Sequence, residues 1–401
     1  MSLSLLPPEL IRAIIRFTRP ASPAGYTNLS PRLVSLSALC SVSTVFRSIA
    51  TEYLYEHLLL PTEASARLLL RTLASDRWTT GEMAGQARRL VRSVRLGKAV
   101  SWGEEVDGGF VGDVLASVGG EQLEEAGFAG LGVDGGAFKR LERMLQCSPL
   151  LDSPTVQADK QPRTRSVVTH LSLISTELII DDDSAITLPA LTHLHLQDTR
   201  ISDKVFGDYS AILSPDVLPR LRHLASVVSS HDEEPTHAST EAAFATLAPQ
   251  LRSLSLDEHI SWLGTDDVQL WSSMANLSHL HVILPLRAEG DAWVITRALE
   301  QLPSALRVLD LCTREDDKFL FASGAVMSES VGDRASLRGL EVLRLPLIGA
   351  FRFGQSEEHV ALREEVVASL EAVTEMATGR GAKVEWRDWT EDEWVHHSIV
   401  D

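Results

Sequence analysis

Leucines alternate with polar residues in seven short segments of the second half of the chain. The segments read THLSL, THLHL, RHLAS, RSLSL, SHLHV, RVLDL and EVLRL, and six of them carry a further leucine three residues before the anchor leucine. Alternation puts the leucines on one face of a strand and the residues between them on the other. Because the unit L-x-x-L-x-L recurs every 23 to 34 residues, the pattern predicts parallel strands stacked in chain order. The anchor leucines are Leu171, Leu194, Leu224, Leu254, Leu280, Leu309 and Leu343.

Between these segments the hydrophobic positions change to helical spacing. Stretches such as EAAFATLAPQL, DVQLWSSMANL and DAWVITRALEQL each carry one apolar stripe. Strand, helix and strand at this period predict a curved solenoid in which each unit contacts mainly its neighbours. The ends of a solenoid need covering, so we expect a strand at residues 88–97 to cap the front. At the back we expect a helix over EEVVASLEAVTEMA and the segment AKVEWRDWTEDEW to close the sheet.

The first 57 residues carry apolar positions at helical spacing. Pro7 and Pro8 can open a helix whose apolar stripe continues to Phe17, since the first helical turn needs no backbone N–H donors. Ser43 is a candidate N-cap for a later helix within residues 39–57. Three short helices in this span cannot bury such wide stripes among themselves. The surplus apolar surface therefore predicts a protein partner.

The order of these residues resembles an F-box. The family pattern of Leu-Pro-x-Glu with two apolar residues, an apolar helix, a second helix and then Val-Ser-x-x-Phe-Arg is matched by Leu6, Pro7, Glu9, Leu10, Ile11, Ile14, Val42, Ser43, Phe46 and Arg47. The link between the first two helices is longer and richer in Pro, Gly and Ser than the family usually has. The resemblance implies docking on a Skp-family adaptor within a cullin-RING ubiquitin ligase. An ordinary helical lead-in without a partner is the alternative. The expected adaptor-binding residues are Leu6, Pro7, Leu10, Ile11, Ile14, Val42 and Phe46.

A mixed region follows the helical start. We expect a short strand or turn and then a helix that turns Leu68, Leu69 and Leu73 inward, before the half-buried strand at residues 88–97. This order is similar to fungal-type F-box proteins that carry leucine-rich repeats.

Glycine-rich sequence then interrupts the pattern. Residues 101–136 are expected to be an insertion with one helix near residues 114–118. A helix at 137–151 and a polar linker at 152–166 lead into the leucine repeat.

Composition and cysteine usage narrow the class of protein. No run of 18 apolar residues is present and the N-terminus lacks the basic segment of a secretory signal, so we expect neither a membrane span nor a signal peptide. Cys40, Cys147 and Cys312 are far apart and odd in number, which predicts neither a disulfide framework nor a zinc site. A reducing compartment, the cytoplasm or the nucleus, is the expected location.

Charge is unevenly distributed within the net value of -18. Residues 1–100 carry 13 Lys and Arg against 6 Asp and Glu, and the remainder carries 24 against 49. Nucleic acid is therefore not an expected partner for most of the chain.

Histidines concentrate on one face of the predicted sheet. The residues that flank each anchor leucine look outward on the concave side of a leucine-rich solenoid, and six of the thirteen histidines occupy these positions. A metal or pH-responsive patch and a polar surface for a protein partner are the two interpretations. No Cys or carboxylate completes a metal-ligand set there, which favours the protein partner. The expected substrate-binding residues are His170, His193, His195, His223, His279, His281, Asp310 and Arg344.

Acidic clusters follow the predicted strands and would share one rim of the solenoid. Several of them also complement helix N-termini, which is a sufficient structural explanation. Their summed negative field nevertheless favours a basic protein substrate. The clusters are Asp181 to Asp183, Asp232 to Glu234, Asp257 and Glu258, Asp266 and Asp267, Glu289 and Asp291, Asp316 and Asp317, and Glu357 and Glu358.

Motifs of catalysis or cofactor binding are weak. Gly130, Gly132 and Gly135 spell G-x-G-x-x-G, but the preceding EEAGFA does not look like a buried strand and no second βαβ half follows. The sequence contains no P-loop, G-x-S-x-G, H-E-x-x-H or C-x-x-C motif. We expect no enzymatic activity, cofactor or metal.

These patterns predict an α/β protein with three parts. They are an F-box-like helical trio at 1–57, a linker at 58–166, and a leucine-rich-repeat solenoid with a C-terminal cap at 167–401. The predicted function is a non-catalytic substrate-recognition subunit that binds a Skp-family adaptor at one end and a protein substrate on the concave face. A scaffold that binds the adaptor without ubiquitylation is the alternative, and a nucleotide-binding enzyme built on the glycine-rich insertion is the third candidate.

Overall fold

The computed structural model describes the parts of the chain that carry the helical start and the strands. The described residues are 7–17, 34–74, 90–97, 113–114, 123–129, 132–133, 168–174, 176–178, 188–197, 199–201, 212–227, 237–256, 273–283, 302–312, 339–346, 371, 374–375 and 377–387. The chain divides into two compact units. Unit 1 is Met1–Phe206 with Asp216–Arg220, and unit 2 is Gly207–Pro215 with Leu221–Asp401.

Unit 1 begins with three helices, which we call the helical trio. Helix α1 spans Pro8–Phe17, residues 34–40 are helical, and α3 spans Thr44–Glu56. The Pro7 carbonyl accepts hydrogen bonds from the backbone of Leu10 and Ile11 at the start of α1. Ser43 caps α3, and its hydroxyl accepts from the Phe46 N–H at 3.2 Å, which confirms the predicted N-cap.

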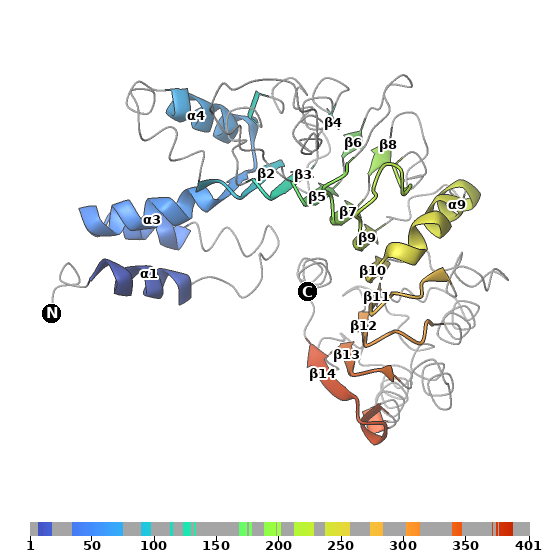
Figure 1. Ribbon diagram of the computed structural model, residues 1–401. Coiled ribbons are helices and arrows are strands. Elements are labelled where there is room, and N and C mark those ends of the chain that lie inside the picture. Colours follow the sequence, from blue (N-terminus) through green and yellow to red (C-terminus); the bar gives the residue numbers. More distant parts are fainter. Residues whose placement is uncertain are drawn as a thin grey trace, which may run out of the picture. The chain divides into compact units, whose positions relative to one another are not determined.

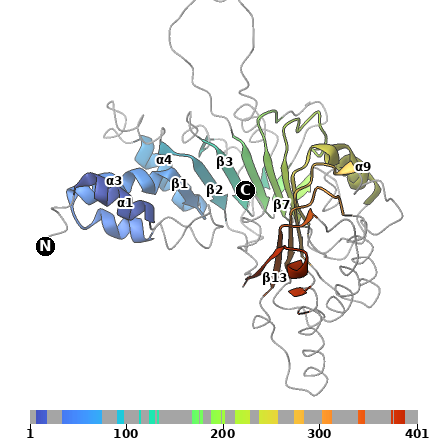
Figure 2. The same cartoon turned by 60° about the horizontal axis from the view of Figure 1, so that its bottom comes forward.

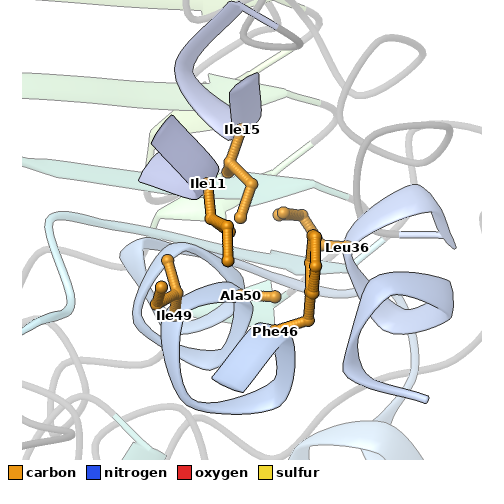
Figure 3. Close-up of a cluster of buried hydrophobic side chains, with 6 residues drawn as sticks. All are labelled: Ile11, Ile15, Leu36, Phe46, Ile49 and Ala50. Carbon is orange, nitrogen blue, oxygen red and sulfur yellow. The ribbon is translucent and has the colours of Figure 1, made fainter. Parts of the chain in front are cut away.

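The helical trio has a hydrophobic core of its own. Six side chains from all three helices converge in it, as Figure 3 shows: Ile11, Ile15, Leu36, Phe46, Ile49 and Ala50. Polar contacts add to this packing. Arg12 of α1 lies 3.3 Å from Glu52 of α3, and Arg47 of α3 donates at 3.0 Å to the Cys40 carbonyl at the end of the second helix. The trio is therefore a packed element with defined inner and outer surfaces.

Helix α3 continues without a break into the first strand of unit 1. Strand β1 spans His57–Leu60, helix α4 spans Glu63–Ala74, and strand β2 spans Ser93–Gly97 (Figure 1). The strand predicted at 88–97 is present over Ser93–Gly97. Its expected role as the front cap is wrong, because it pairs with His57–Leu60 on one side and with Glu125–Ala129 on the other. The prediction that Leu68 points inward is wrong, because its side chain is 63% exposed, whereas Leu69 is buried.

Five parallel strands of unit 1 pair in chain order. They are β1, β2, β3 (Glu125–Ala129), β5 (His170–Ile174) and β7 (His193–Gln197) (Figure 2). One register runs through all the pairs, in which the buried side chains of Leu58, Val94, Ala126, Leu171 and Leu194 are partners. Parallel pairing in this unit thus begins directly after the helical trio.

Strand β3 corrects a prediction about the glycine-rich region. The segment EEAGFA was expected not to be a buried strand, yet Glu125–Ala129 is one, with Ala126 and Phe128 fully buried. Ala126 and Phe128 occupy the inward positions that leucines hold in β5, so the segment lacks the leucines that mark the other strands.

A short second sheet accompanies the first in unit 1. It contains β4 (Gly132–Val133), β6 (Glu177–Leu178) and β8 (Arg200–Ile201), all parallel. Two buried threonines, one just before β6 and one just before β8, donate hydrogen bonds to backbone carbonyls. Thr176 donates to the Phe128 or Ile174 carbonyl, and Thr199 to the Leu173 or Gln197 carbonyl, at 2.9 to 3.3 Å. Gly132 therefore lies in a strand rather than at the start of a phosphate-binding helix.

Unit 2 repeats the parallel arrangement. Six strands pair in chain order: β9 (His223–Val227), β10 (Ser253–Leu256), β11 (His279–Ile283), β12 (Val308–Cys312), β13 (Val342–Pro346) and β14 (Lys383–Arg387). Helix α9 (His237–Leu247) and a 3-10 turn (Ala248–Gln250) precede β10, as the pattern EAAFATLAPQL predicted.

The predicted leucine ladder is confirmed in both units. All seven anchor leucines are buried and align in register with their neighbours, and the six leucines that precede them by three residues are also buried. Strand β14 pairs with β13 as the last strand, where the segment AKVEWR was expected to close the back. Both units are therefore α/β, with parallel strand pairing dominant in each.

Several predictions lie outside the described residues. They are the helices at 137–151 and over DAWVITRALEQL, the linker at 152–166, and all the acidic clusters, while within 114–118 only Val114 is described and is helical. Among the helices that the structure describes, none combines the length and apolar character that a membrane span requires.

Candidate functional site

An apolar surface remains uncovered on the helical trio. The exposed side chains are Leu10 at 52%, Ile14 at 47%, Val34 at 67%, Val42 at 51% and Val45 at 40%. These residues come from α1, the second helix, the turn that follows it, and α3, which lies beside α1 (Figure 1). We call these five residues the apolar trio surface. Exposed aliphatic side chains concentrated on one small element are typical of an interaction site.

The burial pattern divides the expected adaptor-binding residues. Leu10, Ile14 and Val42 are exposed on the apolar trio surface, and Pro7 is exposed at the start of α1. Ile11 and Phe46, by contrast, are 0% and 4% exposed because they fill the trio's own core. Their expected role as contacts is therefore replaced by a packing role. Leu6 lies outside the described residues.

The sheet of unit 1 carries two rows of mostly polar residues opposite its apolar ladder, which we call the polar face of unit 1. In the first row the partners along the sheet are His57, Ser93, Glu125, His170 and His193. In the second row they are Leu59, Arg95, Gly127, Ser172 and His195. Register alone therefore brings the expected residues His170, His193 and His195 together.

His170 and His193 form a stacked pair on this face. Their ring centroids are 3.9 Å apart and the planes differ by 13°. Each ring also contacts the threonine that precedes it. Nδ1 of His170 is 2.7 Å from the Thr169 hydroxyl, and Nδ1 of His193 is 2.8 Å from the Thr192 hydroxyl. Stacking and the threonine contacts fix the orientation of both rings. Both histidines are partly exposed, so the rings are also accessible.

An ion pair lies beside the stacked histidines. Arg95 is almost fully buried and donates through Nε to Glu125 Oε1 at 3.1 Å. Burial raises the pKa of Glu125, but the Arg95 charge and hydrogen bond outweigh it, so the pKa of this carboxyl lies below its ordinary value. Sequence reasoning missed both residues, since neither flanks an anchor leucine. These two residues could be found only from the register in which β2 and β3 pair with β5.

His195 is buried and does not reach the surface of the sheet. Its side chain is 2% exposed, and Nδ1 lies 2.9 Å from the Ser172 hydroxyl. Burial, with a smaller contribution from the Arg95 charge, lowers the pKa of His195 to about 3. The ring is therefore neutral at physiological pH, and we exclude it from the residues available to a partner.

Unit 2 carries a buried charge cluster on the corresponding face of its sheet. Asp310 of β12 accepts from His279 Nε2 at 2.8 Å and from Arg344 Nη1 at 3.2 Å, and Nδ1 of His281 lies 3.6 Å away. Arg344 also donates to Glu385 of β14 at 3.0 Å. Four of the expected substrate-binding residues are thus brought together, but the side chains of Asp310 and His281 are fully buried and those of His279 and Arg344 are only 10% and 13% exposed. Their contacts with each other indicate a stabilising role.

The remaining expected residue, His223 of β9, is partly exposed and is the register partner of Ser253. Among the residues that the structure describes, no group of three or more His, Cys, Asp or Glu side chains is arranged to hold a metal ion. No protein-family model matches this chain, and no curated protein matches it.

Proposed function

We propose that this protein is a non-catalytic substrate-recognition subunit of a cullin-RING ubiquitin ligase. In this proposal the apolar trio surface binds a Skp-family adaptor, and the polar face of unit 1 binds a protein substrate. The observation that carries it is that the helical trio has its own core and still exposes Leu10, Ile14 and Val42, three residues of the F-box pattern. Exposed aliphatic side chains gathered on a small element that already has its own core are typical of a surface that binds a protein partner.

The junction between the two proposed binding regions supports this function. Helix α3 ends at Glu56 and β1 begins at His57, so the trio and the sheet of unit 1 are joined by continuous secondary structure. The Glu56 carbonyl also accepts from the Arg92 N–H at 2.9 Å, just ahead of β2. A receptor that presents a substrate at a defined distance from its adaptor benefits from such a connection.

The leucine-ladder architecture supports the second half of the proposal. Parallel strands with buried leucines on one face and polar side chains on the other are what a leucine-rich-repeat platform requires. The platform offers many polar positions for contact with a protein.

Charge introduced into the apolar trio surface tests adaptor binding. We expect Ile14→Asp combined with Val42→Asp to weaken co-purification of a Skp-family adaptor by at least about 30-fold, because two hot-spot contacts are lost and charge is placed in an apolar interface. Leu68→Asp is the matched control, since Leu68 is an aliphatic residue of α4 outside the trio and is also exposed, at 63%. Circular dichroism should show that all variants keep the wild-type fold.

Equal adaptor recovery with the Ile14 and Val42 variant would refute the proposed docking surface. If the adaptor binds but the reconstituted complex with cullin supports no ubiquitylation, the scaffold function replaces the ligase function.

A further inference from the structure

Hydrogen bonds of the threonines beside the stacked histidines favour one tautomer of each ring. The Thr192 hydroxyl donates to the Thr169 carbonyl at 3.1 Å, and the Thr169 hydroxyl donates to the Glu124 carbonyl at 3.4 Å. A hydroxyl has only one proton, so an oxygen that donates to a carbonyl must accept from its other neighbour. That neighbour is Nδ1 of the following histidine in both cases. Each neutral ring then holds its proton on Nδ1 and its lone pair on Nε2.

The surroundings of His170 favour a positively charged donor. Glu125 is its register partner on β3, and Glu124 precedes Glu125. Burial lowers the pKa of His170 while Glu125 and Glu124 raise it, and the resulting pKa lies below the ordinary value, so the ring stays neutral at pH 7. A neutral imidazole with an Nε2 lone pair in a negative potential is an acceptor suited to an ammonium or a guanidinium group.

We propose that the stacked pair of His170 and His193 is a recognition site for a lysine or arginine side chain of the protein substrate. Nε2 of His170 accepts the hydrogen bond and His193 holds the ring in place by stacking. Glu124 and Glu125 supply the negative potential, and the Arg95 charge reduces the contribution of Glu125. This proposal rests on the proposed function in that the cation belongs to a bound protein. It assigns a basic substrate to a defined position on the polar face of unit 1.

The test measures tautomer and binding on the same full-length protein. Protein labelled with ¹⁵N-histidine is assigned at His170 by comparison with His170→Phe, and an acetylated, amidated tetra-arginine peptide is the probe at 150 mM salt. We expect the His170 ring to carry its proton on Nδ1 and the peptide to shift its Nε2 resonance. We expect His170→Phe, which keeps a ring for stacking, to weaken peptide binding about tenfold, the value of one charged hydrogen bond.

Two further variants separate this site from general attraction to an acidic chain. Thr169→Val removes the acceptor for Nδ1 without changing volume or net charge, and we expect it to weaken binding about threefold or more and to shift the tautomer toward Nε2–H. Thr246→Val is the matched control, because the Thr246 hydroxyl donates only to the Ala243 carbonyl of its own helix. The net charge of -18 attracts the peptide equally in all of these proteins.

A proton on Nε2 in the wild-type ring, or unchanged peptide affinity in both His170→Phe and Thr169→Val, would overturn the proposal. So would a His170 resonance that responds to zinc but not to the peptide, since that outcome marks a metal site. Adaptor co-purification is measured separately, so a failure here leaves the docking proposal intact, and a failure of docking leaves the peptide result interpretable.

Discussion

At the scale of single residues, Asp310 shows how a charge is held inside the sheet of unit 2. Burial alone raises the pKa of its carboxyl, but the interactions with His279 and His281 outweigh burial, and the pKa lies well below its ordinary value. Because Arg344 joins Asp310 to Glu385, the cluster links side chains of four neighbouring strands. A buried ion of this kind is costly to leave without its counter-charge.

We predict that Asp310→Asn lowers the free energy of unfolding by about 3 kcal/mol, because Arg344 loses the fully buried one of its two counter-ions and keeps only Glu385. Urea denaturation measures the change. Glu341→Gln is the matched control, since Glu341 forms an exposed pair with Arg307 at 3.5 Å, and we expect a change within about 0.5 kcal/mol. Equal effects of the two substitutions would show that the buried cluster adds nothing beyond a surface pair.

The direction of the pKa shift fixes the pH range in which Asp310 stabilises the fold. The folded pKa lies below the unfolded value of about 3.9, so the contribution is present above that value and is lost as pH falls through the folded pKa. The stability difference between wild type and Asp310→Asn should therefore shrink below about pH 4. A difference that grows with acidity would contradict the assignment.

At the scale of elements, the N-cap of α3 sets the boundary between the last two helices of the trio. We predict that Ser43→Ala costs about 1 kcal/mol of stability, because the Phe46 N–H loses its acceptor. Ser48→Ala in the same helix is the matched control. Ser48 is exposed in the helix interior, where alanine has the higher helix propensity, so its substitution should be neutral or stabilising by up to about 0.5 kcal/mol. Thermal unfolding monitored by circular dichroism distinguishes the opposite signs.

The strands with an anchor leucine were predictable because their signal is local. Alternation and the leucine three residues earlier both depend only on which positions within one segment are buried. Every strand predicted from them is present. Strand β3 was not predictable in this way, because Ala126 and Gly127 occupy positions that leucine and a polar residue hold in β5. Its identity depends on pairing with β2, which is a property of two segments and not of one.

The limits of prediction for the candidate sites have the same origin. Helical spacing identified the apolar stripe of α1. It could not separate the buried residues of the stripe from the exposed ones, since Ile11 and Ile14 differ only in whether another helix covers them. Alternation likewise placed His170 and His195 on one face. It could not predict that the former remains partly exposed while the latter is enclosed.

At the scale of the whole molecule, each compact unit carries its own run of paired strands and its own buried leucines. In repeat architectures stability is distributed over interfaces between neighbouring repeats, so a defect is felt most strongly in the strands next to it. Leu171 of β5 lies in unit 1 and Leu309 of β12 lies in unit 2, and they hold the same position in the ladder.

We predict that Leu171→Ala and Leu309→Ala each cost about 2 to 5 kcal/mol, because each removes a buried side chain and leaves a cavity. Native-state hydrogen exchange should locate the two losses differently. Amides of β3, β5 and β7 should exchange faster in Leu171→Ala, and amides of β11, β12 and β13 in Leu309→Ala, while the exposed Leu68→Ala leaves both sets unchanged. Uniform acceleration across both units by either core substitution would instead show that the two units unfold as one cooperative body.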